Sequence, residues 1–151
     1  MHIPDDYVTS IQERLNLYTD LNKLETEEEV EKFREQLRDR FGKVPPQVDD
    51  LFEGLRLRWV CKDLGFERLI LKNNKLRCYF VENPQSPYYE SALFQAILQH
   101  VGTVGPRKGI TFKKSNKHFI MIKDNVRSLR AALKVLRNIQ EQVNAEAAVG
   151  P

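Results

Sequence analysis

The chain has 151 residues, 41% of them hydrophobic and 30% charged, which suits one domain, or one domain with a helical extension, with a buried core and a charged surface. No apolar run approaches the roughly 20 residues that cross a bilayer, and the N-terminus lacks the basic start and apolar stretch of a signal peptide. These features, with two cysteines that have no ligand spacing, predict a cytoplasmic protein with reduced thiols.

The net charge of +3 is unevenly distributed along the chain. Residues 1–53 hold 7 Lys or Arg and 14 Asp or Glu, whereas residues 54–151 hold 17 and 7. This asymmetry indicates either partner surfaces of opposite sign or two halves that partly neutralise each other within one fold.

The first third of the chain has the pattern of three helices. The first is expected after Pro4, with Asp5 and Asp6 as helix-starting carboxylates and an inward face of Ile11, Leu15 and Tyr18. The second begins at the capping-box pair Thr26 and Glu29, is expected to end at Gly42 in the left-handed region, and carries the apolar stripe Val30, Phe33, Leu37 and Phe41. The third begins at Pro45-Pro46, ends near Gly65 and carries Val48, Leu51, Leu55 and Trp59.

From residue 66 the hydrophobic period changes from helical to alternating. A hairpin is expected to turn at Asn73-Asn74, and a helix to follow from the N-cap Ser86 to Gly102. A second hairpin turns at residues 115–117, and a final helix capped by Asp124 or Asn125 has the inward face Val126, Leu129, Leu133, Leu136 and Val143. The order predicts an α+β fold with N-terminal helices (residues 1–65) followed by two β-hairpin–helix units (66–144) and a weakly patterned tail (145–151).

The sequence offers little for catalysis. The three histidines, His2, His100 and His118, have no ligand spacing with Cys, Asp or Glu. The glycine-rich segment 102–109 lacks the Gly-Lys-Ser/Thr ending of a phosphate-binding loop and is expected to be a helix-to-strand turn. We therefore predict no catalytic, cofactor or metal site in this domain.

Two charged helix faces are the candidate interaction surfaces. Glu31, Glu35 and Asp39 are spaced by four residues on the second helix and form an acidic row that could dock on a basic surface. The alternatives are that the row only keeps the helix soluble, or that Asp39 holds the following turn locally. On the final helix, Arg127, Arg130, Lys134 and Arg137 form a basic row that could contact phosphates, although no aromatic residue is interleaved to stack bases.

Three segments of the first 81 residues carry a resemblance: Ile3-Pro4-Asp5-Asp6-Tyr7-Val8, Arg14-Leu15-Asn16-Leu17-Tyr18, and Leu37-Arg38-Asp39-Arg40-Phe41-Gly42-Lys43-Val44-Pro45. The Asp-Arg-Phe-Gly-x-x-Pro core at residues 39–45 is the most specific of them. The chain resembles the C-terminal domain of the bacterial transcription-repair coupling factors, the Mfd translocases. Beyond residue 85 only the order of elements agrees with that family.

The resemblance implies a regulatory domain of an ATP-dependent DNA translocase, with the ATP bound in the motor domains of the parent. It implies that the domain packs on the parent's UvrB-like N-terminal module, hides the surface that recruits UvrA, and restrains the motor until RNA polymerase is engaged. On this hypothesis the acidic row Glu31, Glu35 and Asp39 is the candidate inhibitory contact. The alternative hypothesis is a non-specific nucleic-acid-binding module that uses the basic row of the final helix.

Overall fold

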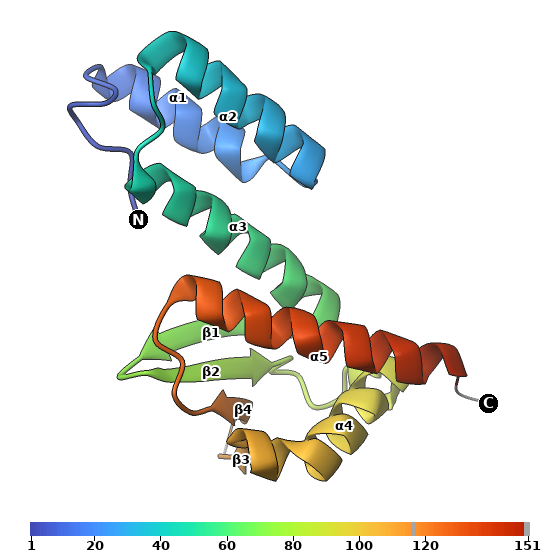
Figure 1. The fold of residues 1–151 in the computed structure, drawn as a ribbon. Coiled ribbons are helices and arrows are strands. Elements are labelled where there is room, and N and C mark those ends of the chain that lie inside the picture. The colour runs from blue at the N-terminus through green and yellow to red at the C-terminus, as the bar shows by residue number, and fades with distance from the viewer. Residues whose placement is uncertain (116, 150–151) are drawn as a thin grey trace. The chain divides into compact units, whose positions relative to one another are not determined.

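The computed structural model describes residues 1–115 and 117–149 (Figure 1). The chain divides into two compact units, Met1–Arg56 and Leu57–Pro151. Helices make up the first unit, and a four-stranded antiparallel sheet with helices makes up the second, so the predicted α+β class is confirmed. The elements are α1 (Ile11–Asn22), α2 (Glu27–Phe41), α3 (Pro46–Leu64), β1 (Phe66–Lys72), β2 (Lys75–Phe80), a 3₁₀ turn η1 (Pro87–Glu90), α4 (Ala92–Lys108), β3 (Ile110–Lys114), β4 (Phe119–Lys123) and α5 (Leu129–Val149).

In the first unit, α1, α2 and the start of α3 enclose a small apolar core. Phe33 of α2 and Phe52 of α3 meet edge to face, with ring centroids 6.1 Å apart, and both are almost fully buried. The predicted capping box begins α2: Thr26 Oγ1 accepts from the Glu29 amide, and the Glu29 carboxylate accepts from the Glu25 amide. Gly42 ends α2 with φ +92°, although its ψ is extended and so it is not in the left-handed helical region.

The expected start of α1 was wrong, and so were two of its three predicted inward residues, Ile11 and Leu15, whereas Tyr18 is half-buried. The helix begins after Ser10, whose hydroxyl accepts from the Glu13 amide, and not at Asp5 or Asp6. Residues 1–10 instead form an irregular segment that buries Ile3 and Val8. The sequence of α1 contains two apolar rows, and packing buries the one formed by Leu17 and Leu21, at 6% and 5% exposure, while Ile11 and Leu15 stay 69% and 55% exposed.

Paired substitutions on α1 test which row is buried. Leu17→Ala should lower the free energy of unfolding by about 2–5 kcal/mol, because it removes buried methyl groups and leaves a cavity. Leu15→Ala should change it by roughly 0.5 kcal/mol or less, as is usual on a helix surface. Urea unfolding followed by circular dichroism measures both. Equal losses for the two variants would contradict this orientation of α1.

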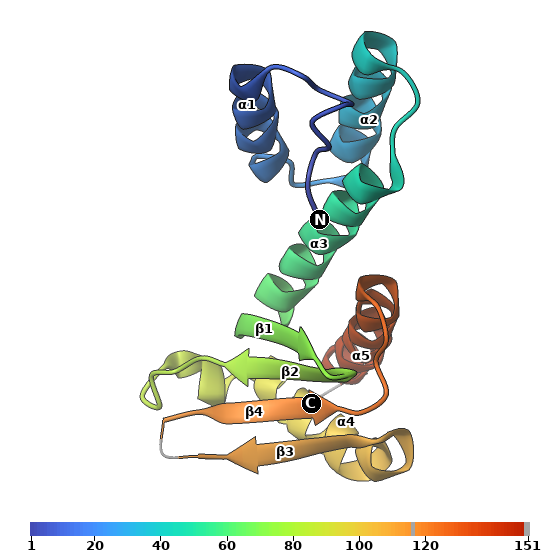
Figure 2. The ribbon, with the colours of Figure 1, turned by 90° about the vertical axis from the view of Figure 1, so that its left-hand side faces the viewer.

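The second unit is a two-layer arrangement. Its strand order is β1-β2-β4-β3, so the two hairpins join through an antiparallel pair between β2 and β4. The α4 and α5 helices cover one face of the sheet, and Figure 2 views the sheet from its other face. Asn73 and Asn74, both with positive φ, form the tight turn of the first hairpin as predicted.

The core of this unit lies between the sheet and its helices. Inward-facing strand residues Leu76, Cys78 and Met121 are fully buried. They pack in one cluster with side chains from the helices, including Cys61 and Leu64 of α3, Ile97 and Val101 of α4, and Ala132, Leu136, Ile139 and Val143 of α5.

The expected end of α4 at Gly102 was wrong. The helix continues through the segment predicted to be a loop and ends at Lys108, where Gly109 takes the left-handed conformation at φ +72°. The helix continues because residues beyond Gly102 still have a buried side, as Gly105 packs inward like Val101 before it. Gly105 lies so close to β3 that a Cβ there would be 2.9 Å from the Ile110 carbonyl oxygen. This contact with β3 offsets the intrinsic cost of glycine in a helix, about 1 kcal/mol.

The helix starts also differ from expectation. Ser86 caps only the 3₁₀ turn η1, and Ser91 caps α4 itself. The α5 helix begins after Ser128, whose hydroxyl accepts from the Ala131 amide. The prediction of Asp124 or Asn125 as the cap was therefore wrong. At its other end α5 continues to Val149, whereas the tail was expected to begin at residue 145.

The two helical glycines of α4 offer a matched test. Gly105→Ala should destabilise the chain by roughly 1–3 kcal/mol, since the new methyl group would overlap the β3 backbone. Gly102→Ala should stabilise it by about 0.5–1 kcal/mol, because no other atom lies within 4 Å of the Cβ position. Thermal unfolding measures both changes. If α4 ended at Gly102, neither the loss of stability in Gly105→Ala nor the gain in Gly102→Ala would be expected.

Candidate interaction surfaces

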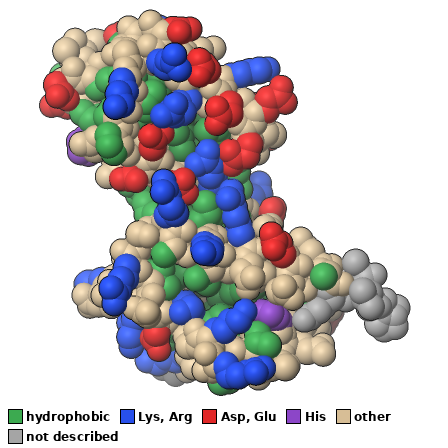
Figure 3. Space-filling model, in the orientation of Figure 1, with side chains coloured by type: hydrophobic (Ala, Val, Ile, Leu, Met, Phe, Trp, Pro, Cys, Tyr) green, Lys and Arg blue, Asp and Glu red, His purple; other side chains and the backbone are tan. Residues whose placement is uncertain are grey.

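The acidic row of α2 lies on its solvent-facing side. Glu31, Glu35 and Asp39 are all exposed, whereas Val30 and Leu37 of the same helix are buried. Figure 3 shows acidic and basic side chains interspersed over the helices of the first unit. The helix therefore buries an apolar stripe and presents the acidic row to solvent.

Most basic residues around this row are already paired with other acids. Arg34 binds Asp49 with 3.1 Å between Nε and Oδ1, and Arg40 binds Glu13 with 2.7 Å between Nη2 and Oε1. The pKa of Arg34 is raised, chiefly by its hydrogen bond to Asp49.

Within the row itself, Glu35 has a loose pair with Arg38 at 3.9 Å. Among the residues that the structure describes, Glu31 and Asp39 make no ion pair within 4.0 Å. The row is thus only loosely paired, although Glu31 and Glu35 also contribute to the raised pKa of Arg34.

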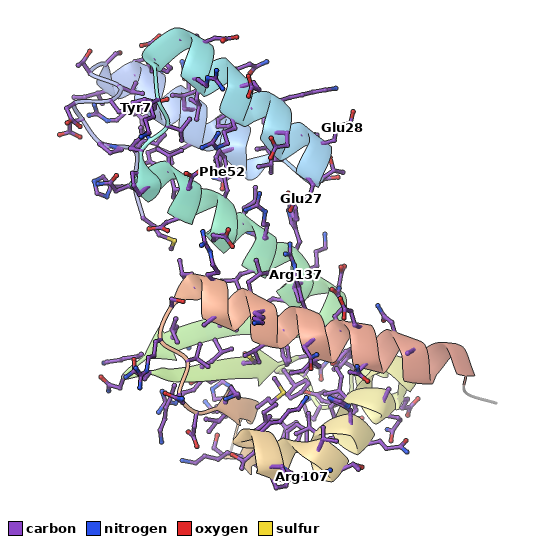
Figure 4. The ribbon with its side chains drawn as sticks, viewed as in Figure 1. Tyr7, Glu27, Glu28, Phe52, Arg107 and Arg137 are labelled. Carbon is purple, nitrogen blue, oxygen red and sulfur yellow. The ribbon has the colours of Figure 1, made fainter. Side chains whose placement is uncertain are left out.

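The turn after α2 is held by Tyr7 (Figure 4). Its hydroxyl donates to the carbonyl oxygens of Leu37 and Gly42, at 3.2 and 2.9 Å, and its ring contacts Phe41. Arg40 lies over the Phe41 ring, with its guanidinium carbon 4.7 Å from the centroid. These contacts explain the turn without any contribution from the Asp39 carboxylate.

The basic row predicted for the final helix is only partly helical. Arg127 precedes α5, and its Nε donates to Asn125 Oδ1 at 3.2 Å, so its assignment to the helix was wrong. Arg130, Lys134 and Arg137 do lie on the exposed side of α5. This side is opposite the buried face that packs toward the sheet.

The structure places a further set of residues together on the uncovered face of the sheet, which we call the open sheet face. Strand pairing aligns Arg68, Tyr79, Ile120 and Lys113 in one row across β1, β2, β4 and β3. A second row contains Ile70, Arg77, Ile122 and Thr111, and Lys72 pairs with Lys75 at the hairpin end. Side chains opposite one another in paired strands share a face.

Sequence reasoning missed this surface. The alternation of Arg77 and Tyr79 with buried Leu76 and Cys78 did indicate that one side of each hairpin is polar. What no local pattern indicated is the β2–β4 pairing, which brings the polar sides of both hairpins onto one continuous face.

A cavity of about 510 Å³ opens at the end of the sheet where β3 turns into β4. Aromatic side chains form much of its wall, and Lys114, Lys117 and Glu82 lie among the residues that line it. Its lining residues are Val81, Glu82, Pro84, Tyr89, Phe94, Lys114, Ser115, Lys117, His118 and Phe119. Of these lining residues, Ser115 donates from its hydroxyl to the His118 carbonyl oxygen at 3.5 Å.

Within residues 1–115 and 117–149, no group of three or more His, Cys, Asp or Glu side chains is arranged to hold a metal ion. Among the helices of these described residues, none is long and apolar enough to span a membrane.

Both cysteines are free and buried, Cys61 on α3 and Cys78 on the covered face of β2. Burial raises the pKa of the Cys61 thiol to about 11 and holds that of Cys78 well above its usual range. A thiol with a raised pKa is a weak nucleophile at neutral pH, because the thiolate is the reactive form.

The comparison with known families decides where the chain belongs. Residues 1–91 match the family model described as the TRCF domain. The chain belongs to the TRCF domain family.

Relatives of this TRCF domain are named transcription-repair-coupling factors. The protein from Rickettsia bellii is 33% identical over 54% of this chain, and the one from Escherichia coli K12 is 31% identical over 70% of it. The chain spans only 7% and 9% of the lengths of these two proteins.

The fold agrees with a solved structure described as the C-terminal domain of transcription-repair coupling factor. That comparison covers 99% of this chain and 90% of the other, with a TM-score of 0.68 at 18% sequence identity. The similarity therefore extends the fold beyond residue 91, through both hairpin–helix units.

The raised thiol pKa values predict how the stability of this TRCF domain depends on pH. In the unfolded chain the thiols ionise near their ordinary pKa of about 8.5, whereas in the folded chain Cys61 stays protonated until about pH 11. The folded state then binds more protons, so stability should fall as the pH rises from about 9 to 11. Urea midpoints across this range measure the fall, and Cys61→Ala should make it shallower. An unchanged slope in the variant would exclude this cause.

Proposed function

We propose that this TRCF domain is a regulatory, autoinhibitory domain of a transcription-repair coupling DNA translocase. In this proposal it docks on the UvrB-like N-terminal module of its parent, masks the surface that recruits UvrA, and restrains the motor until RNA polymerase is engaged. The parent's motor supplies the ATP-dependent contact with DNA. The family membership of residues 1–91 is the observation that carries the proposal.

The acidic row of α2 is the proposed contact. It is exposed, and its neighbouring cations are largely occupied by other acids, as Arg34 is by Asp49 and Arg40 by Glu13. Such a row suits a releasable interface, because exposed charged contacts exchange with water and ions at little cost. A large apolar interface would not open so readily.

For Asp39, a local structural role in the turn after α2 is the alternative to a role in docking. It lies inside the Asp-Arg-Phe-Gly-x-x-Pro segment that carries the family resemblance. Since Tyr7 satisfies the carbonyl groups of Leu37 and Gly42 at that turn, a purely local role for Asp39 has less support than a role in docking.

Charge reversal of the row tests the proposal. The double variant Glu35→Lys/Asp39→Lys should bind the purified N-terminal module of the parent about tenfold more weakly, equivalent to about 1.4 kcal/mol. The loss should shrink at high salt, because ionic strength screens exposed charges. Isothermal titration calorimetry at two salt concentrations provides the measurement.

The matched control is Asp20→Lys/Glu25→Lys, which makes the same change in net charge at exposed positions outside the row. It should bind nearly as well as the unmodified chain. Equal weakening by both variants would mean that net charge and not the row guides docking. No binding by the unmodified chain would remove the autoinhibitory proposal itself.

A further inference from the structure

We propose that the open sheet face is a second binding surface and that its ligand is single-stranded nucleic acid, held by phosphate contacts and by stacking on Tyr79. This inference does not depend on the acidic row or on autoinhibition. It rests on what strand pairing gathers on one side of the second unit, away from α4 and α5 (Figure 2).

The charge of this face is strongly one-sided. Five cationic side chains belong to its rows: Arg68, Lys72, Lys75, Arg77 and Lys113. Acids lie only at its borders: Asp124 is 3.9 Å from Lys75, and Glu67 adjoins Glu82, whose amide donates to the Glu67 carboxylate. The centre of the face therefore attracts an anionic polymer, and each phosphate it neutralises releases counterions.

The centre of the face also supplies what the basic row of α5 lacks, an aromatic ring. Tyr79 is half-buried, with the Arg68 guanidinium carbon 5.2 Å from its ring centroid and the His118 ring edge-on at 5.4 Å. Proteins that bind single strands without sequence preference combine such a ring, on which a base stacks, with flanking cations that follow the backbone.

Aliphatic neighbours complete the platform. Ile70 and Ile122 are partly exposed, and Ile120, between Tyr79 and Lys113 in its row, is 8% exposed. Ile70 and Ile122 give a weakly hydrated surface beside the ring, with Ile120 buried beneath it, and an unstacked base loses little by leaving water there. A duplex keeps its bases stacked inside and cannot use either the ring or this surface.

The size of the face limits the affinity. Arg68 and Lys72 are four residues apart on one strand, roughly 13 Å, and β1 to β3 spans three strand spacings, roughly 14 Å. So small a surface contacts only a few nucleotides. With at most five phosphates neutralised, the logarithm of the binding constant should fall with the logarithm of salt at a slope no steeper than about −3.5.

The experiment is a fluorescence-anisotropy titration of the whole chain against a labelled oligothymidylate of about 15 nucleotides. It is repeated from about 50 to 200 mM salt, with a duplex of equal length and an oligouridylate as further probes. Binding to both single strands, with the expected slope and a weaker response to the duplex, would support the proposal. Equal or tighter binding of the duplex would overturn it.

Two pairs of charge reversals locate the surface. Arg77→Glu/Lys113→Glu removes two cations from the open sheet face and should make the salt slope shallower by about 1.4. Arg130→Glu/Lys134→Glu makes the same charge change on the exposed side of α5 and should leave the slope almost unchanged. If the α5 pair has the larger effect, the proposal fails and the phosphate contacts belong to that helix.

Tyr79→Ala separates stacking from charge. Tyr79 lies outside the core cluster, so the variant should keep its far-ultraviolet circular dichroism spectrum. It should bind oligothymidylate about fivefold more weakly or worse, with the salt slope unchanged, because a stacked base is lost and no phosphate contact is. Unchanged affinity would refute the stacking role. Poly-glutamate that competes as well as the oligonucleotide would instead indicate an acidic protein partner.

Discussion

The antiparallel pairing of β2 with β4 is the contact on which the second unit depends. Each hairpin alone is only marginally stable in water, and their joining creates a sheet wide enough for helices to cover on one side. Cys78 and Met121 are cross-strand partners at this seam, and both are fully buried. The same pairing that builds the core also lines up the polar sides of both hairpins, so the open sheet face is a direct consequence of the fold.

The two units use charge differently. In the first unit, acids outnumber bases, and several bases pair with acids of another element, as Arg40 does with Glu13 and Arg56 with Glu27. In the second unit, bases predominate, and some of them, such as Arg77 and Lys113, gather on the face of the sheet opposite α4 and α5. Such segregation costs little when the charges are exposed and screened. It gives one small domain surfaces of opposite sign.

The family assignment and the fold support each other over different parts of the chain. The family match covers residues 1–91, whereas the structural similarity covers both hairpin–helix units. The family match thus covers the first unit and the start of the second, and the structural similarity adds the fold of the rest. Core positions of a sheet tolerate many apolar substitutions as long as the alternation of buried and exposed positions is kept.

The sequence by itself determined the types of the helices and strands, their order, and several local features such as caps and turns. The Thr26–Glu29 capping box and the Asn73-Asn74 turn were readable because their hydrogen bonds and backbone angles involve only neighbouring residues. Only the tertiary structure decided which apolar row of α1 is buried, where α4 ends, and which residues meet across the sheet. Leu17 is buried while Leu15 is not, and Gly105 stays helical, because distant elements supply the packing. Periodicity identifies a helix or a strand, but contacts between elements determine which elements pack together. The pairing of the strands is what places Tyr79 on the same face as five cations.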